Sequence, residues 1–401
     1  MNFFNKLKNY ASPKCKIVNK VAFFITEEYL FQHYKNVINK LEINSFEIIF
    51  ANKFKQKIYE KFITKIESYG YNIHFLEDCM HRYKYKILLT HMYLGGNTNI
   101  NENLLIKIKL LFNRLSQKFK ISLFKSDNEQ FFQKKLGIYN IKFQYGLDIS
   151  LESEDYNSVF DEFFCHGPRD SKVLKKNFDT KVFEMGYPKY DDYFHDIENK
   201  EIKKNLLNKF KCDLKKPTIL WICTVSRYFS TILTYKKYIE MLTDKYNVIL
   251  RPHPIEVDPK QNRFNKKVFD VLNSKKFFVN KNPSQNMTEL YSISDYVFCD
   301  YGGSIFSTLY LGKNILLLNH ENANKDETIY NSTSLEVRNY LPSISKKDCN
   351  KNFIKKIDDI ISSSKNSIQI QEARKVYFGE KNKGNNSNLT AARLKELLDK
   401  K

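Results

Sequence analysis

Three short groups of residues in the second half of the chain have the side chains that phosphate binding needs. Each follows an apolar stretch, and the groups are Cys223-Thr224-Val225-Ser226-Arg227, Arg251-Pro252-His253-Pro254 and Asp300-Tyr301-Gly302-Gly303-Ser304. They combine cations, hydroxyl groups, an imidazole and a glycine pair. Cations and hydrogen-bond donors are the groups that bind phosphate oxygens, so the first question is whether the fold brings the three groups together.

The glycine pair precedes residues 304–311, whose pattern predicts a helix. A Gly-Gly-Ser turn that opens a helix leaves backbone N–H groups unpaired at the positive end of the helix dipole, and such an arrangement binds anions. Glycine also lets a phosphate approach the backbone closely. The hydroxyl of Ser304 or Ser307 can add a hydrogen bond. The alternative is that Ser304 only caps the helix and the glycines only permit a tight turn.

Two prolines fix the backbone on either side of His253. An imidazole held in this way beside Arg251 suits charge neutralisation on a diphosphate, or proton donation to a leaving phosphate. The alternative is a structural histidine at the end of a strand. Thr224, Ser226 and Arg227 supply hydroxyls and one more cation. The chain has no P-loop and no GxGxxG, so neither nucleoside triphosphate hydrolysis nor dinucleotide redox chemistry is indicated.

The scaffold that must position these groups is predicted from alternating apolar runs and helical patterns. Strands are expected at 20–26, 46–52, 71–76, 85–93, 138–148, 162–167 and 181–188, and again at 218–224, 246–254, 277–280, 295–300 and 314–319. Helices are expected at 27–42, 53–69, 102–119, 233–244, 264–273, 285–292 and 304–311, with a helical last sixty residues. This alternation predicts an α/β protein with parallel sheets.

The alternation is interrupted once, by a highly charged stretch near 189–216 with few branched apolar residues. We therefore expect a Rossmann-like domain at 1–190, a linker at 191–216 with one helix, and a second Rossmann-like domain at 217–401 whose last helices can pack back on the first. In open α/β sheets ligands bind outside the carboxyl ends of the strands. The three polar groups would then meet at one edge of the second sheet, facing a central cleft.

Composition excludes several classes of function. The net charge is +21, with 66 basic against 45 acidic residues, which attracts polyanions such as anionic lipid or phosphorylated molecules, unless it is only a lysine-rich surface. The basic residues are spread out and no zinc-finger or RNA-binding signature occurs, so nucleic acid is not an expected partner. The seven cysteines and eight histidines show no metal-ligand spacing, so neither a metal nor any other cofactor is expected.

No stretch reaches the roughly 18–20 apolar residues of a membrane span, and no signal-peptide pattern is present at the N-terminus. We therefore expect a cytoplasmic protein. The first ten residues, MNFFNKLKNY, could lie on the inner face of the membrane as a short basic amphipathic helix, or they could be a frayed terminus. An anionic membrane surface is thus one partner that the basic charge allows.

The motifs in order, TILWICTVSR, NVILRPHP and SDYVFCDYGGSIFSTLYLGKNILLLN, resemble the catalytic domain of the CDP-glycerol glycerophosphotransferases, which polymerise teichoic acids and capsules. Upstream, Gly186-Tyr187-Pro188-Lys189-Tyr190-Asp191 is similar to the family's Gly-x-Pro-basic-x-Asp turn. Downstream, FGEKNKGNNSNLTAARLKELL is similar to its closing turn and helix. The resemblance runs from about residue 140 to the end.

The resemblance implies a GT-B fold, in which the second domain holds most of a nucleotide-activated donor, and a metal-independent reaction. By analogy His253 would lie at the donor pyrophosphate. Asp300, Tyr301, Gly302, Gly303 and Ser304 would occupy the family's Asp-Tyr-Ser-Ser turn, with Gly302 in place of a serine. Fewer hydroxyls there would mean more reliance on backbone N–H groups.

One departure concerns the general base. The family carries a His-Gly pair that is thought to deprotonate the acceptor hydroxyl, and the matching residues here are Tyr145 and Gly146. A phenol with a pKa near 10 is a poor base at neutral pH. Asp148 or His91 could take the role, although Asp148 could equally cap a helix and His91 could be an ordinary loop residue. His166, in FFCHGP, is a secondary candidate for which a structural or interdomain role is expected.

The expected function is transfer of a polyol phosphate, glycerol or ribitol phosphate, from a CDP-linked donor to a glycan or glycolipid acceptor of the cell surface. The alternatives are a GT-B glycosyltransferase that uses a CMP- or UDP-sugar, and a non-catalytic anion-binding scaffold of a capsule assembly complex. The donor would be a substrate, so no cofactor is implied. Release of CMP or UDP, lost on His253→Ala, separates the enzyme from the scaffold.

Overall fold

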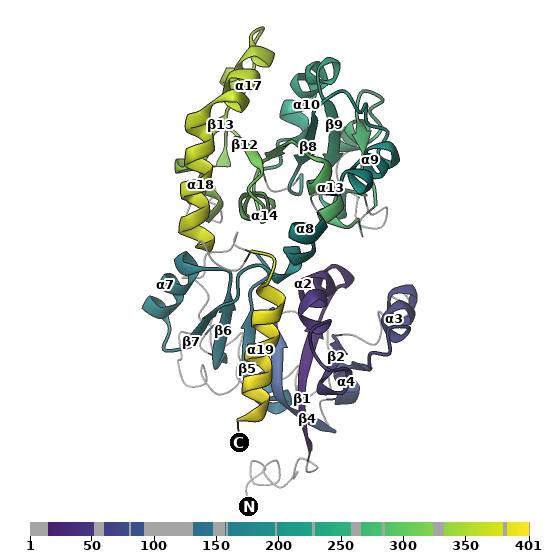
Figure 1. Ribbon diagram of the computed structural model, residues 1–401, viewed down its shortest axis with the longest axis vertical. Coiled ribbons are helices and arrows are strands. Elements are labelled where there is room, and N and C mark those ends of the chain that lie inside the picture. Colours follow the sequence, from purple (N-terminus) through teal and green to yellow (C-terminus); the bar gives the residue numbers. More distant parts are fainter. Residues whose placement is uncertain are drawn as a thin grey trace, which may run out of the picture.

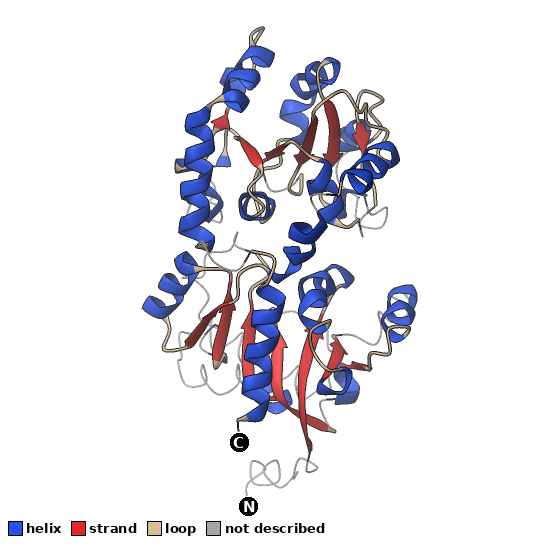
Figure 2. Ribbon diagram, in the orientation of Figure 1, coloured by secondary structure: helices blue, strands red, loops and turns tan. Residues whose placement is uncertain are grey.

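The chain folds around two parallel β-sheets, one in each half (Figures 1 and 2). The computed structural model describes residues 15–51, 60–79, 82–91, 131–146, 157, 159–196, 199–226, 229–257, 266–282, 285–323, 333–379 and 383–400. Helices flank both sheets, as Figure 2 shows. The prediction of a doubly wound α/β protein is confirmed.

The sheet of the N-terminal half has seven parallel strands in the order β3-β2-β1-β4-β5-β6-β7. The strands are β1 Lys16–Ile25, β2 Phe46–Phe50, β3 Ile73–Phe75, β4 Tyr83–Thr90, β5 Gly137–Phe143, β6 Glu162–Cys165 and β7 Lys181–Glu184. The central strands are continuous apolar runs, because helices cover both of their faces. In β1, Val21 to Ile25 are fully buried.

The sheet of the C-terminal half has six parallel strands in the order β10-β9-β8-β11-β12-β13. They are β8 Thr218–Ile222, β9 Asn247–Arg251, β10 Phe278–Val279, β11 Tyr296–Cys299, β12 Asn314–Leu318 and β13 Ser343–Ile344. The order reverses direction between β8 and β11, and ligands of open α/β sheets bind at such a switch point. Sequence analysis did not anticipate β13.

The helices have their apolar residues at helical spacing. In α2, Leu30, Phe31, Tyr34 and Ile38 lie on one buried face. The α-helices are α2 Glu28–Ile38, α3 Glu60–Glu67, α4 Leu76–Cys79, α6 Phe131–Leu136, α7 Pro168–Asn177, α8 Asp191–Asp196, α9 Lys200–Lys209, α10 Ile232–Glu240, α11 Pro254–Val257, α12 Lys266–Leu272, α13 Met287–Ile293, α14 Ser304–Tyr310, α16 Thr333–Glu336, α17 Phe353–Ser362, α18 Ser364–Phe378 and α19 Asn386–Asp399. The 3-10 helices are η1 Ile43–Ser45, η5 Pro188–Tyr190, η6 Met241–Asp244, η8 Val337–Asn339 and η9 Lys346–Asp348. The helix expected at 102–119 lies outside the described residues.

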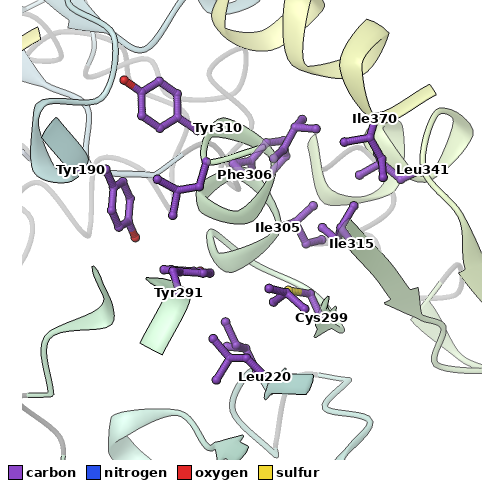
Figure 3. Packing of buried hydrophobic residues seen from close by; sticks show 14 of the residues in the cluster. Tyr190, Leu220, Tyr291, Cys299, Ile305, Phe306, Tyr310, Ile315, Leu341 and Ile370 are labelled. Carbon is purple, nitrogen blue, oxygen red and sulfur yellow. The ribbon is translucent and has the colours of Figure 1, made fainter. Parts of the chain in front are cut away.

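The charged stretch between the halves contains η5, α8 and α9 and not the single helix that the sequence suggested. Its tyrosines are part of the core of the C-terminal half. Tyr190 packs edge-on against Tyr291 with ring centroids 5.9 Å apart, and Figure 3 shows both rings beside Phe306 and Tyr310 of α14. The high charge of the stretch hid these buried aromatic residues.

The chain crosses between the halves a second time near its end, where α18 is followed by α19. Figure 1 shows α19, in yellow, lying across the sheet of the N-terminal half, where it contacts α2, β1 and β4. Its Arg393 donates to both carboxylate oxygens of buried Glu162 on β6, at 2.9–3.0 Å. The last helix of the chain is therefore a structural part of its first half.

The two crossings are joined to each other by hydrogen bonds. The carboxylate of Asp191 accepts from the side chain of Asn386, at 3.2 Å, and from the backbone N–H of Ser387, at 2.5 Å. Gly186, with a φ of +71°, packs directly on Asn386. A side chain at Gly186 would collide with Asn386, so this glycine has a structural role at the crossing.

Candidate functional site

The carboxylate of Asp300, at the end of β11, connects two of the three predicted phosphate-binding groups. It accepts the backbone N–H groups of Thr224, at 2.8 Å, and of Thr231, at 3.0 Å. It also accepts its own neighbour's N–H, that of Tyr301. Burial raises the pKa of Asp300 to about 6, against the opposing effect of these N–H donors. The carboxylate of Asp300 thus holds these loops in place, and both of its oxygens accept hydrogen bonds from backbone N–H groups.

Arg251 is the last residue of β9 and His253 follows the strand, and the two side chains make different contacts. Arg251 is buried, and its Nη1 donates to the carbonyl of Asn282 at 2.6 Å, which ties the end of β9 to the residues after β10. His253 is partly exposed, and its Nδ1 lies 3.2 Å from the backbone N–H of Ile255. An Nδ1 that accepts a hydrogen bond leaves the proton on Nε2. His253 is therefore placed as a donor through Nε2.

The Gly302-Gly303 turn is partly exposed at the start of α14. Gly302 has a φ of +96°, a conformation that favours glycine. Its N–H donates to the hydroxyl of Ser334 at 3.2 Å, so this amide is not available to a ligand as the sequence suggested. The N–H groups of Gly303 and Ser304 have no partner in the part of the chain that the structure describes. Two amides remain for an anion.

Arg338, in η8, is a residue of this site that sequence analysis missed. Its guanidinium stacks on the ring of Tyr301, 3.9 Å from the centroid, and Nη2 donates to the carbonyls of Asp300 and Leu318. The buried Nε and Nη1 atoms have no partner among the described residues. Burial lowers the pKa of Arg338, but a guanidinium stays charged. Leaving buried N–H donors unsatisfied is costly, and an anionic ligand would satisfy them.

Ser226 and Glu256 complete this edge of the sheet. The backbone N–H of Ser226 donates to the buried carboxylate of Glu256 at 2.5 Å, which connects the loop after β8 with α11. The sequence did not single out Glu256. Arg227, predicted as a further cation here, lies outside the described residues.

On the N-terminal half, Tyr145 lies just after the end of β5. Its ring is met edge-on by His33 of α2, at 5.9 Å between centroids, and by His91 after β4, at 5.6 Å. His91 is buried, lies 3.3 Å from the hydroxyl of Thr26, and has a pKa lowered to about 4 by burial and by Lys142. Asp148, the other proposed base, lies outside the described residues.

Gln144 holds the neighbouring backbone in place. Its Nε2 donates to the carbonyl of Gly146, at 3.1 Å, and to the carboxylate of Asp170, at 2.8 Å. Its Oε1 accepts the backbone N–H of His166 at 3.1 Å. Burial raises the pKa of Asp170 to about 6, against the opposing effect of Arg169. The ends of β5 and β6 are thus fixed relative to each other through one amide side chain.

His166 follows β6 and is fully buried. Its Nδ1 lies 2.8 Å from the carbonyl of Gly186, whereas its Nε2 has no partner among the described residues. Its ring lies 4.1 Å from that of Tyr187. The Tyr187 hydroxyl is 3.3 Å from the carbonyl of Tyr145 and 3.4 Å from the hydroxyl of Ser307 on α14. This contact joins the residues after β5 to the first turn of α14.

Lys189, the basic residue of the Gly-x-Pro-basic-x-Asp turn, lies beside these histidines. Its Nζ is 3.3 Å from Nε2 of His33. Burial lowers the pKa of Lys189 to about 8, and burial together with Lys189 lowers the pKa of His33 well below its usual value. His33, on a helix outside the recognised motifs, gave no signal in the sequence.

Two further features bear on the class of site. In the described ranges, no group of three or more His, Cys, Asp or Glu side chains is arranged to hold a metal ion. No helix in the same ranges has the length and apolar character needed to cross a membrane.

Solved structures show which fold this is. The structure of the wall teichoic acid polymerase TagF soaked with CDPG has a TM-score of 0.60 and 13% identity, with 98% of this chain and 93% of that one covered. UDP-GlcNAc 2-epimerase from Neisseria meningitidis bound to UDP-GlcNAc gives 0.54 and 14%, with 95% and 99% covered. A glycosyltransferase from Rickettsia africae gives 0.51 and 12%, with 97% and 100% covered. The fold is GT-B.

Sequence comparison shows the family. A search of curated protein sequences finds no significant match. The profile of the CDP-Glycerol:Poly(glycerophosphate) glycerophosphotransferase family matches residues 131–394. The matched region includes Tyr145, Lys189, His253, the Gly302-Gly303 turn and Arg338, from both sides of the site. The chain therefore belongs to the CDP-Glycerol:Poly(glycerophosphate) glycerophosphotransferase family and is a transferase.

Proposed function

We propose that this chain transfers glycerol phosphate from CDP-glycerol to a hydroxyl group of a cell-surface glycan. The observation that carries the proposal is the family match over residues 131–394. Support comes from the TagF structure soaked with CDPG, which aligns with nearly the whole chain. The Nε and Nη1 atoms of Arg338 and the amides of Gly303 and Ser304, which have no partner among the described residues, are groups that a nucleoside diphosphate donor would need.

In the proposed reaction the donor's diphosphate lies between the Gly302-Gly303 turn, Arg338 and His253. The acceptor oxygen attacks the phosphorus that carries glycerol, a new P–O bond forms, and the bond from that phosphorus to the bridging oxygen breaks. CMP leaves with the electron pair. Arg338 and the Nε2–H of His253 would stabilise the negative charge that develops on it.

The proposed reaction needs no cofactor beyond the donor and no metal ion, because the guanidinium of Arg338 and the N–H donors of the site would neutralise the phosphate charge in place of a metal. An excess of EDTA should therefore leave the rate of CMP release unchanged. A rate that is lost with EDTA and restored by Mg²⁺ would contradict this part of the proposal.

The test measures CMP release from CDP-glycerol with poly(glycerol phosphate) as acceptor, and thermal protection by CDP-glycerol, CDP-ribitol, CMP-sugars and UDP-sugars. We expect CDP-glycerol to protect the protein and to be turned over, and His253→Ala to lower the rate by about 10²-fold or more. His195→Ala is the control, because His195 contacts the carbonyl of Gly384 at the crossing of the halves. Its rate should stay within about twofold of wild type.

The outcome of the donor panel also decides between donor classes. Turnover of a CMP- or UDP-sugar in place of CDP-glycerol would show a glycosyltransferase, and protection by no nucleotide would refute the proposal. We also propose that the basic surface attracts the anionic growing polymer or an anionic membrane. Salt-sensitive binding to vesicles that contain phosphatidylglycerol, but not to neutral vesicles, would show the attraction to an anionic membrane.

A further inference from the structure

The resemblance matches Tyr145 to the family's histidine base, and a phenol is a poor base at neutral pH, so the proton of the acceptor hydroxyl needs another group. Three buried histidines lie at this end of the N-terminal sheet. His33 on α2 and His91 after β4 contact the ring of Tyr145, and His166 after β6 packs on Tyr187. A base needs a ring nitrogen with a free lone pair. The hydrogen-bond partners of the three rings decide which of them has one.

His33 and His91 use their Nε2 atoms within the protein. Nε2 of His33 faces the ammonium group of Lys189 at 3.3 Å. An ammonium group can only donate, so Nε2 of His33 accepts and its proton sits on Nδ1. Nε2 of His91 lies 3.3 Å from the hydroxyl of Thr26, the residue that follows β1. Neither ring offers Nε2 to a substrate, and in both rings the nitrogen without a partner among the described residues is Nδ1. Nδ1 of His33 carries the proton by the argument above. The hydroxyl of Thr26 can donate or accept, so this contact leaves both tautomers open to His91.

His166 has the opposite arrangement. Its Nδ1 faces the carbonyl of Gly186 at 2.8 Å. A carbonyl can only accept, so the proton of the neutral ring sits on Nδ1 and the lone pair on Nε2. Nε2 is buried and has no partner among the described residues. Leaving a buried acceptor unsatisfied is unfavourable, and a hydroxyl group that donates to it would remove that penalty.

The position of His166 relative to the donor side fits the same role. Its ring lies against that of Tyr187, whose hydroxyl reaches Ser307 in the first turns of α14. That helix begins at the turn where the donor diphosphate is proposed to bind. On the donor side, His253 has its proton on Nε2, so the two imidazoles have opposite tautomers. One is suited to give a proton and the other to take one.

We propose that His166 is the general base of this enzyme, in place of the residue at position 145. Its Nε2 takes the proton of the acceptor hydroxyl while the acceptor oxygen forms its bond to the phosphorus that carries glycerol and CMP departs. The inference rests on the proposed function. Burial lowers the pKa of His166 to about 4, so the ring is neutral at pH 7. A bound anionic donor raises the pKa of a nearby imidazole and so strengthens the base.

A structural role is the competing explanation for this ring. Gly167 lies where α18 ends, and a side chain there would collide with the carbonyl of Tyr377. Gly167 is thus needed for packing, and the ring of His166 itself packs against Tyr187 and Phe378, whatever the histidine does in catalysis. The test must therefore separate loss of the Nε2 atom from loss of packing.

His166→Asn makes this separation, because an asparagine Nδ2 can keep the hydrogen bond to the Gly186 carbonyl while Nε2 is removed. We expect kcat for CMP release to fall by about 10²–10⁴-fold, with KM for CDP-glycerol and thermal protection by CDP-glycerol within about threefold of wild type. His74→Asn is the matched control. His74 lies on β3 at the edge of the sheet, with its Nε2 3.3 Å from the carboxylate of Glu47. Its replacement should leave kcat within about twofold.

A second measurement does not depend on activity or on a variant that folds. Nitrogen-15 NMR of histidine-labelled wild-type protein reports which ring nitrogen carries the proton, and we expect Nδ1 for His166. A proton on Nε2, or a His166→Asn kcat within about fivefold of wild type, would overturn the assignment. If the proposed function is wrong, wild type itself releases no CMP. If only the assignment of the base is wrong, wild type still releases CMP, and only the NMR result and the kcat of His166→Asn differ from the expected values.

Discussion

Replacing Gly186 by alanine tests whether the two crossings between the halves are held together as the structure indicates. Gly186 has a φ of +71°, and a Cβ there would lie 2.0 Å from Oδ1 of Asn386 and 2.5 Å from its Cγ. Asn386 is buried, and its Nδ2 donates to the carboxylate of Asp191 and to the hydroxyl of Tyr310. The side chain of Asn386 cannot move away without breaking these bonds.

The magnitude follows from two contributions. The left-handed conformation costs a non-glycine residue about 1–2 kcal/mol. Displacing Asn386 leaves buried polar groups unsatisfied, at about 1–3 kcal/mol for each. With two hydrogen bonds of Asn386 broken, Gly186→Ala should therefore destabilise the protein by about 3–8 kcal/mol, which is a large part of the stability of a typical domain.

Gly312→Ala provides the matched control. Gly312 has a φ of +68°, and a Cβ there would have nothing within 4 Å. This variant should lose only the conformational contribution of about 1–2 kcal/mol. The difference between the two variants then measures the contact between the crossings.

Urea unfolding gives the comparison, followed by far-UV circular dichroism and by fluorescence. The single tryptophan is Trp221, buried in the sheet of the C-terminal half, so fluorescence reports that half alone. Separation of the two transitions would show that the halves unfold independently. The reasoning is refuted if Gly186→Ala costs no more than Gly312→Ala. It is equally refuted if Asn386→Ala is as damaging in the Gly186→Ala background as in wild type.

Three further predictions concern single side chains. Arg393→Met leaves buried Glu162 without its cation and should cost about 3–5 kcal/mol in urea unfolding, with part recovered by adding Glu162→Gln; an additive double variant would contradict this. Burial raises the pKa of Asp170 from 3.8 to about 6, so the folded state binds this proton more tightly than the unfolded state. The stability of wild type relative to Asp170→Asn should therefore fall by about 3 kcal/mol as the pH rises from about 3 to 8, and a melting-temperature difference that does not change with pH would argue against it. Arg338→Gln should weaken the binding of CDP by about 10-fold or more and leave that of cytidine unchanged by calorimetry, whereas equal losses for both would exclude a contact with phosphate.

Much of the fold could be predicted because buried parallel strands are continuous apolar runs. The segments around Phe23, Leu88 and Leu317 were recognised in this way, and each lies in a central strand. Strand β13 was missed because two residues, Ser343 and Ile344, are too few to show a pattern. The sequence of the crossing between the halves predicts a linker with one helix, because its charged residues outnumber its tyrosines. In the structure those tyrosines are buried in the core of the C-terminal half.

The candidate site could be predicted only where its residues directly follow a strand. Asp300 and the glycine turn met that condition, and so did the loop with Thr224. Arg338 did not, since it follows no strand and matters because its guanidinium stacks on Tyr301. The importance of His166 depends on the carbonyl of Gly186, twenty residues along the chain, and no local pattern records which nitrogen of a ring is free.

The position of α19 has a consequence for how the protein is made. Ala391, Leu394, Leu397 and Leu398 belong to the core of the N-terminal half, whose other buried members lie between Val21 and Met185. A ribosome that has completed β7 must add about 200 more residues before this helix emerges, which takes about 10–40 s at ordinary elongation rates. During that interval the helix that covers part of the core of the first half is missing, so apolar side chains of that core are exposed to solvent. Premature termination within the last helix would therefore damage the first half of the protein, which is already synthesised by then.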